Sequence, residues 1–569
     1  AKAGNINNAL TKSDGELVLI FDTDHIPVTT FLDETVPLLA DPKVGFVQTA
    51  HHFYNPDIFQ TSLRTPARVP DEQDMFHHGI QPARDKWGGA FFVGTGAVFR
   101  RKALEEVGGL LLMSITEDIH TSQHLHARGW ESRYVGKNLA VGLNAENLAS
   151  YLVQRTRWMQ GCLQVFFRDN PLFTRGLRMR HRLGYFASQY YFLFPIARVI
   201  FFAAPLCFLL FHWHPIFADV STLLAFLLPF MICLPVMSQL LLSRWPRVIW
   251  ASAYENTISV ALFRAIFDLI LPKKLAFKVT PKGINSDVSA FDFQSSKYSL
   301  IVFAITFIAI VKGLFEFYYF GIEKDAYFFN LSWAVANLLL LITPLVIARE
   351  HPRYPYQNRI RKKIPVSVNA LGFNLSAATF DIDQTGLSVL YDGQAIIPQK
   401  VGLRLGENDA VSAIARTRFF DKDDHGRKRV CFEFIEPGED QLGWILQRVH
   451  CDPATWNTEA VRRTHSNLIM IFHFFRGLFR TFHVPKDLRR MQPRDKILRL
   501  KRLRIAENHR WALITNQSRQ GLRVYTIGSP FRADTVSFRF MGEITSYQVV
   551  YSERKYFFLN RIGLKKSIL

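Results

Sequence analysis

Four long apolar stretches constrain the fold of this chain more than any other feature of its 569 residues. They cover residues 183–211, 219–243, 298–320 and 328–348. Each is close to or longer than the roughly 20 apolar residues that a helix needs to cross a bilayer. The composition agrees, because 49% of the residues are hydrophobic and 50 are Phe. We therefore predict four transmembrane helices within residues 181–348, and hence a multi-pass membrane protein.

Basic residues around these stretches indicate the orientation of the helices. Lys and Arg that flank a transmembrane helix stay on the cytoplasmic side. They are frequent within residues 175–182, 244–297 and 349–363, whereas loops 213–218 and 321–327 contain a single Lys. We therefore expect both soluble regions, before and after the helices, to face the cytoplasm. The segment 244–297 is expected to form cytoplasmic interface helices and a loop.

Some charged residues lie inside the apolar stretches. Arg198 is in the first, and Lys312 with Glu316 is in the third at a spacing of i,i+4, which places the two on one helix face. Charges at this depth usually face a protein interior or a wet channel. Alternatively, Lys312 lies near a helix end and extends to the headgroups.

Net charge and cysteines exclude little. The formal charge of +21 suits an anionic membrane surface, a phosphorylated substrate or a nucleic acid equally well. The five cysteines have neither metal-ligand spacing nor a paired framework of the secreted kind, so we predict reduced thiols in packing roles.

Residues 1–180 have the pattern of a mixed α/β domain. Short apolar runs alternate with polar, helix-like stretches, and three runs are expected strands: Leu17–Phe21, Val44–Thr49 and Gly89–Phe99. The first of these looks like the middle of a domain. We therefore expect part of this domain, and further membrane helices, to precede the first residue.

Two aspartates follow the first expected strand directly. Asp22 and Asp24 come just after Leu17–Phe21, at a strand end, where α/β folds collect ligand groups. A hard divalent cation such as Mg²⁺ needs few protein carboxylates when phosphate oxygens complete its shell. The pattern therefore favours a metal and diphosphate site, although a bare Asp-x-Asp is common by chance.

Two further motifs follow in order. Thr116-Glu117-Asp118 precedes a helix-like stretch, and a carboxylate there can act as a general base toward an acceptor hydroxyl. Gln154-Arg-Thr-Arg157-Trp158 comes next. It combines an aromatic platform for a sugar ring with planar donors for hydroxyl or phosphate.

Together, these motifs resemble those of the processive inverting glycosyltransferases with a GT-A fold, which include cellulose, chitin and hyaluronan synthases. The resemblance implies that residues 1–180 are the C-terminal part of an α/β GT-A domain. It implies that the Asp-x-Asp pair binds UDP and its metal, Mg²⁺ or Mn²⁺, with Asp118 as catalytic base. The residues implied to bind UDP or the acceptor are Lys2, Asp22, Asp24, Glu117, Gln154, Arg157, Trp158, Thr280 and Lys282.

Three further stretches are similar to the bacterial cellulose synthase catalytic subunits. They are Lys2-Ala-Gly-Asn5, residues 46–55 with Ala50 in place of Pro, and residues 91–95 with Val93 in place of Cys. Both departures are small and uncharged, so they put local loop shape in doubt rather than chemistry. Residues 277–283 look like the gating loop of this family, in which Thr280 and Lys282 would meet the diphosphate.

Each motif also has a simpler interpretation. Trp158 could anchor a membrane interface, Asp118 could cap the following helix, and Lys282 could be an ordinary cytoplasmic charge. Their joint occurrence in order favours the glycosyltransferase.

The chain after the last apolar stretch predicts small β-barrels. Alternating strands such as Val366–Asn369 and Arg429–Phe434 indicate one barrel within residues 349–455, and a second strand-rich block follows within 490–569. Between them, residues 456–489 contain an aromatic-rich segment that predicts an amphipathic interfacial helix or a buried linker helix.

The resemblance implies a PilZ-type barrel that binds cyclic di-GMP as an allosteric activator, and two motif sets of near-equal spacing in this chain suggest a tandem pair of such domains. That family uses an Arg-x-x-x-Arg stretch and an Asp/Asn-x-Ser-x-x-Gly turn. The first barrel has a degenerate set, with Asp383 where the family has Ser, and its candidate residues are Arg359, Lys363, Asp381 and Gly386. Lysine cannot reproduce the bidentate guanidinium fork. The second set is complete and comprises Arg490, Arg494, Asn516, Ser518 and Gly521.

The resemblance implies cellulose synthesis from UDP-glucose at a bacterial inner membrane, with the growing glucan and membrane lipid as partners. It also implies a periplasmic accessory subunit and no nucleic acid partner. Another β-glycan, such as chitin, hyaluronan or mannan, remains an alternative product. A non-catalytic cyclic di-GMP receptor would be expected to have degraded motifs, and here they are intact.

Overall fold

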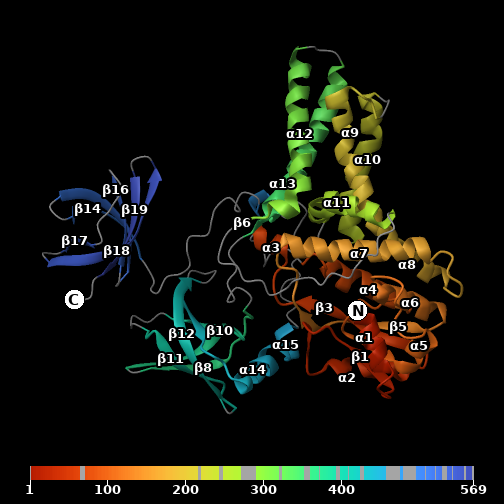
Figure 1. Ribbon diagram of the computed structural model, residues 1–569, viewed down its shortest axis with the longest axis horizontal. Coiled ribbons are helices and arrows are strands. Elements are labelled where there is room, and N and C mark those ends of the chain that lie inside the picture. The colour runs from red at the N-terminus through yellow and green to blue at the C-terminus, as the bar shows by residue number, and fades with distance from the viewer. Residues whose placement is uncertain are drawn as a thin grey trace. The chain divides into compact units, whose positions relative to one another are not determined.

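The chain divides into two compact units, residues 1–358 with 446–484 and residues 359–445 with 485–569, which are described separately (Figure 1). The computed structural model describes residues 2–63, 71–215, 219–241, 248–270, 290–319, 323–350, 359–370, 372–391, 397–407, 409–422, 428–456 and 475–477, and the strand backbones between residues 495 and 566.

A five-stranded mixed sheet organises the N-terminal domain. Its order is β1-β4-β3-β5-β2, and only β3 and β5 are parallel among the described pairs. The strands are β1 (Leu17–Ile20), β2 (Ile26–Pro27), β3 (Val44–Phe53), β4 (Ala97–Arg100) and β5 (Glu131–Gly142). The helices are α1 (Lys2–Leu10), α2 (Phe31–Thr35), α3 (Ile58–Ser62), α4 (Gln81–Asp85), α5 (Arg101–Glu106), α6 (Glu117–Ala127) and α7 (Leu148–Arg168).

The expected strand Gly89–Phe99 is shorter in the structure. Regular pairing begins only at Ala97, because Gly94 and Gly96 have φ of +92° and +64°. These left-handed conformations interrupt an extended strand and are open chiefly to glycine. Residues 89–96 consequently form an irregular segment that enters the site described below.

Three helices of the described residues are long and apolar enough to cross a membrane. They are Met179–Phe211, which comprises α8 (Met179–Tyr190) and α9 (Phe194–Phe211), then α12 (Phe293–Tyr319) and α13 (Lys324–Ile347). The remaining expected span coincides with α10 (Val220–Leu241), whose described apolar segment, Ser221–Leu234, is shorter.

Helix α11 (Val248–Ile270) lies against α7 below the upright apolar helices (Figure 1). Its Trp250, Tyr254 and Leu262 are buried in one cluster with Met159 of α7 and Ile347 of α13. This apolar contact couples the α/β domain to the apolar helices, as expected of an interface helix.

The charged residues of the apolar helices contact other polar groups. Arg198 Nη2 of α9 lies 2.6 Å from Glu255 Oε2 of α11. Lys312 Nζ lies 2.8 Å from Glu316 Oε1 and donates to the carbonyl of Leu209 at 3.0 Å. The Arg198 side chain therefore pairs with a neighbouring helix, which agrees with the interior placement, whereas Lys312 contacts the last turn of α9, which agrees with its alternative placement near a helix end.

Two closed six-stranded barrels follow, and they have the same strand order. The first is β8-β9-β10-β13-β12-β11 and the second is β14-β15-β16-β19-β18-β17. The first comprises β8 (Pro365–Ala370), β9 (Phe373–Asp383), β10 (Gly386–Leu390), β11 (Lys400–Leu405), β12 (Val411–Lys422) and β13 (Lys428–Phe434). The second comprises β14 (Asp495–Ile505), β15 (Asn508–Ser518), β16 (Gly521–Ile527), β17 (Thr535–Phe540), β18 (Glu543–Tyr556) and β19 (Leu559–Lys566). The prediction of two barrels is confirmed.

The first barrel ends earlier than the expected boundary at residue 455. Helix α14 (Glu439–Ile445) stays with the barrel, but the segment from Leu446 to α15 (Pro453–Trp456) belongs to the first unit. Asn138 of β5 donates to the carbonyl of Trp456 at 3.1 Å, and the Trp456 side chain is buried. Burial of this indole on the α/β domain explains the difference. Of the expected linker helix, only residues 475–477 are described, and they are helical.

Candidate functional site

Three segments that are distant in sequence meet at Asp22. Lys2 Nζ, at the start of α1, lies 2.5 Å from Asp22 Oδ1 and also donates to the carbonyl of Gly94. The Asp22 amide donates to Thr95 Oγ1 at 2.8 Å. The first helix, the end of β1 and the irregular segment before β4 thus form one hydrogen-bonded cluster.

Asp24 and His25 lie next to Asp22 and form with it a group of side chains that could hold a metal ion. The Asp24 Oδ1 and His25 Nδ1 atoms are 3.2 Å apart. Asp22, Asp24 and His25 each offer one ligand atom, and these atoms lie within 4.8 Å of one another. The two carboxylates are the ligand type that Mg²⁺ and Mn²⁺ prefer, so the donor set fits the metal expected with a nucleotide diphosphate.

Asp118 lies beside this cluster, in the first turn of α6. A Cβ atom at Gly94 would be 3.4 Å from Asp118 Oδ2 and 3.7 Å from Lys2 Nζ. Gly94 is thus close to both the aspartate and the lysine, and its positive φ is what favours glycine at this position. The alternative role of Asp118 as a helix cap is not seen, because the N-cap residue of α6 is Thr116, and Asp118 Oδ1 accepts from the adjacent Ile119 amide at 2.8 Å.

Burial changes the acidity of this pair of carboxyls. Desolvation, followed by repulsion from Glu117, raises the pKa of Asp118 to about 7. Desolvation also raises the pKa of Glu117, against the opposing charges of Lys2 and Arg157. A carboxylate with a pKa near 7 is suited to accept a proton at neutral pH.

Gln48 of β3 holds the irregular segment in place. Its Oε1 accepts from the Val93 amide at 3.1 Å, and its Nε2 donates to the carbonyl of Thr95 at 2.9 Å. His51 Nε2 contacts the same carbonyl at 3.0 Å. The stretch 46–55 that carried the resemblance therefore supports the site from the sheet.

Helix α7 carries the third motif, Gln154 to Trp158, close to the Glu117 and Asp118 pair. Arg157 is near enough to Glu117 for its positive charge to lower the pKa of that carboxyl. Within this motif the sequence interpretation missed Arg155. Its guanidinium carbon lies 4.2 Å from the centroid of the Trp158 ring, and it forms a buried ion pair with Glu72. The cation–π contact fixes the orientation of the indole that was expected to receive a sugar. No sequence pattern indicated Arg155, because its partner Glu72 is 83 residues away.

Gly161 allows α7 to approach the loop that carries Asp118. A Cβ atom at Gly161 would lie 2.7 Å from the Thr116 amide nitrogen and equally close to its hydroxyl. No ordinary side chain fits there, so this glycine sets the spacing between the second and third motifs.

Several expected site residues are not placed by the structure. Thr280, Lys282, Arg490 and Arg494 lie outside the described residues. Asn516, Ser518 and Gly521 lie on described strand backbones, with the hairpin between β15 and β16 pairing Ser518 with Gly521.

In the first barrel, the corresponding hairpin joins β9 and β10 and pairs Asp383 with Gly386. Asp383 Oδ1 accepts from the amides of Thr385 and Gly386, both at 2.9 Å, and lies 3.2 Å from Arg359 Nε. The Arg359 side chain is only 4% exposed. Asp381 is likewise paired with Arg429 Nη1 at 2.9 Å, whereas Lys363 is exposed. The Arg359 guanidinium, which would have to bind a phosphate of the ligand, is thus already paired with the Asp383 carboxylate of the same barrel.

Comparison with known proteins supports the resemblance drawn from the motifs. Residues 17–241 match the family model described as glycosyl transferase family group 2. Cellulose synthase 1 of Komagataeibacter xylinus is 37% identical over 397 residues, which cover 68% of this chain and 26% of the relative.

Two UDP-forming cellulose synthase catalytic subunits are similar over comparable lengths. That of Komagataeibacter sucrofermentans is 37% identical over 65% of this chain and 50% of its own length. That of Pseudomonas fluorescens is 33% identical over 72% of this chain and 56% of its own length. The chain thus spans between a quarter and just over half of the length of these curated relatives.

Proposed function

We propose that this chain, a relative of the bacterial cellulose synthase catalytic subunits, transfers glucose from UDP-glucose to the 4-hydroxyl of a growing β-1,4-glucan with inversion. The observation that carries the proposal is the meeting of Lys2, Asp22 and Asp118 around Gly94. This meeting supports the proposal, because a lysine, a carboxylate suited to hold a metal ion and a carboxyl whose pKa is raised to about 7 lie close together.

The diphosphate end of the donor is assigned to Asp22, Asp24 and Lys2. A divalent metal, Mg²⁺ or Mn²⁺, would supply Lewis-acid stabilisation of the leaving UDP. Lys2 adds a positive charge that is already oriented by Asp22 and the Gly94 carbonyl. We assign Thr280 and Lys282 of the gating loop to the same diphosphate, by resemblance.

The acceptor end is assigned to Asp118 and the motif on α7. Asp118 takes the proton of the attacking hydroxyl, and its neighbour Glu117 raises its basicity through charge repulsion. Trp158, held by Arg155, gives the terminal sugar a flat apolar surface. Gln154 and Arg157 supply planar donors for hydroxyl or phosphate oxygens.

Membranes that contain the protein test this assignment with radiolabelled UDP-glucose. The expected product is an insoluble glucan that a β-1,4-endoglucanase digests. Asp22→Asn should abolish incorporation, while Lys137→Ala, which breaks an exposed ion pair with Glu34, should leave it unchanged. A labelled product that resists the endoglucanase, or preferential use of UDP-N-acetylglucosamine, would contradict the cellulose assignment in favour of another β-glycan.

We further propose that cyclic di-GMP activates the protein through the second barrel, as a PilZ-type domain. Two observations support this proposal. The two barrels share one strand order, and both candidate turns occupy the hairpin between the second and third strands. In the first barrel, Arg359 is buried against Asp383, which favours a structural role for that set.

The similarity to the cellulose synthase catalytic subunits also supports a proposal about where the protein acts in the cell. We propose a multi-pass protein of the bacterial inner membrane with its catalytic and barrel domains in the cytoplasm. The glucan would leave through the membrane beside the apolar helices, with lipid around them and a periplasmic accessory subunit as partner.

A further inference from the structure

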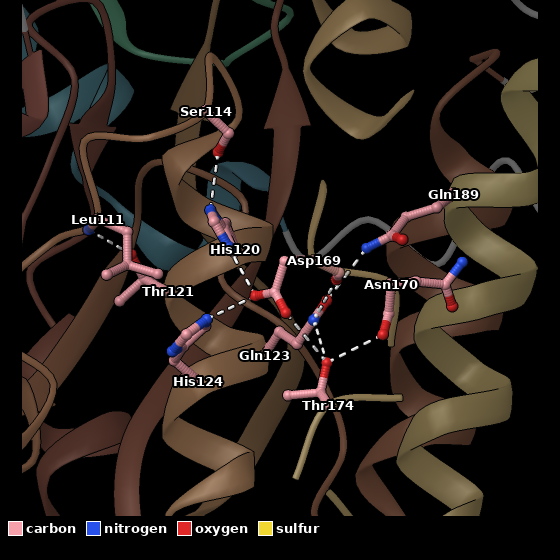
Figure 2. Close-up of polar contacts among 10 residues, drawn as sticks. All are labelled: Leu111, Ser114, His120, Thr121, Gln123, His124, Asp169, Asn170, Thr174 and Gln189. Atoms are coloured by element: carbon pink, nitrogen blue, oxygen red, sulfur yellow. Dashed lines mark hydrogen bonds and ion pairs between the residues drawn. The ribbon is translucent and has the colours of Figure 1, made fainter. Parts of the chain in front are cut away.

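A second cluster of potential metal ligands lies between α6 and the end of α7, and it shares no residue with the cluster of Asp22, Asp24 and His25. His120 and His124 are spaced i,i+4 and point from the helix to one carboxylate, Asp169, directly after the end of α7 (Figure 2). The Asp169 Oδ2 atom lies 3.0 Å from His120 Nε2 and 2.6 Å from His124 Nε2. One atom of each residue lies within 4.8 Å of the others.

The residues around this cluster hold its members in position. His120 Nδ1 contacts Ser114 Oγ at 3.2 Å, which directs the other ring nitrogen, Nε2, to Asp169. Gln123 donates to the Asp169 carbonyl at 2.9 Å and accepts from Gln189 of α8 at 3.2 Å (Figure 2). Metal-binding histidines characteristically have such a partner on the second nitrogen.

The side chain of His120 is buried, whereas those of His124 and Asp169 are partly exposed to solvent. The exposed fractions of these three side chains are 3%, 34% and 27%, respectively. The cluster therefore has one fixed, buried member and an open side from which an ion and a water molecule can enter.

We propose that His120, His124 and Asp169 form a binding site for a divalent transition-metal ion of the zinc class. Zinc takes histidine nitrogen and carboxylate oxygen at about 2.0–2.2 Å, and three protein ligands plus water is a common set. Tetrahedral ligands at that distance are about 3.3 Å apart. His124 Nε2 and Asp169 Oδ2, now 2.6 Å apart, would therefore have to separate by about 0.7 Å, and the partly exposed His124 side chain has room to do so.

The chemistry of the two clusters predicts different ions. Imidazole suits zinc, cobalt, nickel and copper, whereas Mg²⁺ prefers oxygen ligands. Excess Mg²⁺ is therefore expected to occupy the Asp22 and Asp24 cluster and to leave His120 and His124 available.

The site would fasten the helix that begins with Glu117 and Asp118 to the end of α7. His120 is two residues after Asp118, and Asp169 ends the helix that carries Trp158. A bound ion would thus stabilise the spacing of these two helices without taking part in sugar transfer. The alternative is a metal-independent hydrogen-bonded lock of two histidines on Asp169.

Cobalt titration of the full chain in detergent, with excess Mg²⁺ present, separates these possibilities. Co²⁺ bound by nitrogen and oxygen in a tetrahedral site gives intense visible d–d absorption. We expect one such Co²⁺ per chain, displaced by equimolar Zn²⁺. His124→Gln and Asp169→Asn should each abolish the band. Asp24→Asn, which removes a carboxylate of the other cluster, should retain it.

Thermal unfolding provides a second readout, since an ion that binds only the folded state raises the melting temperature. Zn²⁺ should raise the melting temperature of the wild type and of Asp24→Asn, but not of His124→Gln. The absence of a saturable band in the wild type would overturn the proposal, and so would a band that persists in both His124→Gln and Asp169→Asn. Its loss only in Asp24→Asn would assign the ion to the diphosphate site and would equally overturn it.

Discussion

At the scale of single residues, the surroundings of Asp118 decide its acidity, because burial and the adjacent Glu117 raise its pKa to about 7. Asp22, Asp24 and Asp118 were found because they lie in short motifs whose order is informative. The raised pKa of Asp118 could not be predicted, because it results from burial and from the adjacent Glu117 in the folded chain. The same applies to Arg155, whose ion pair with Glu72 depends on tertiary contact.

Replacing Asp118 should reduce activity and increase stability together. Asp118→Asn removes the proton acceptor, so glucose transfer should fall by about 10²–10⁴-fold. The folded state raises the pKa of Asp118 above 3.8, so its ionisation opposes folding increasingly as the pH rises from about 4 to about 7. The variant should therefore melt about 2–4 °C higher at neutral pH, measured by thermal unfolding in detergent. Glu105→Gln, at an exposed carboxylate of α5, should change neither property.

The pH dependence of transfer provides a separate test of Asp118. A general base is active when ionised, so kcat/KM should fall tenfold per pH unit below about 7, the pKa to which burial and Glu117 raise this carboxyl. Glu117→Gln removes the repelling charge, so the acidic limb should move to lower pH. A limb that stays in place in Glu117→Gln would argue against Asp118 as the titrating group.

At the scale of elements, periodicity located most helices and strands but not the interruptions between them. The strand expected over Gly89–Phe99 starts only at Ala97, because two glycines with positive φ precede it. These glycines look like ordinary strand interruptions in sequence. In the structure they shape the segment that meets Lys2 and Asp118.

The spacing of α6 and α7 depends on Gly161. In Gly161→Ala the new methyl group would collide with the backbone of Thr116, so we expect a loss of about 1–3 kcal/mol in stability. Displacing α7 by even part of an ångström should also lower transfer by about 10²-fold. Gly443→Ala is a matched control, because a Cβ at Gly443 of α14 would meet nothing within 4 Å. Activity and thermal unfolding of the two variants should diverge; equal activity would show that this spacing does not position Asp118.

At the scale of the whole molecule, the order of regions was predictable because each has its own pattern of hydrophobicity. An α/β region, apolar helices and two barrels follow one another as expected. The boundary at residue 455 was wrong, because residues 446–456 return to the α/β domain through the buried Trp456. Such a return depends on tertiary contacts, among them the hydrogen bond from the Thr29 amide to the Cys451 carbonyl at 2.9 Å, and local composition does not indicate it.

The repeated barrel makes a prediction about regulation that involves the whole chain. Calorimetric titration of the full protein with cyclic di-GMP should be saturable, because Arg490, Arg494 and the turn at 516–521 form a complete set. Arg490→Ala should weaken binding by about 10–100-fold, the effect of losing a charge-assisted hydrogen bond. Arg359→Ala should bind cyclic di-GMP with the same affinity as Arg418→Ala, because Arg359 is already paired with Asp383. Arg418 serves as the control because it is an exposed arginine of the same barrel. Equal weakening by Arg359→Ala and Arg490→Ala would contradict a ligand site confined to the second barrel, since a structural arginine buried in the first barrel should not change affinity in the second.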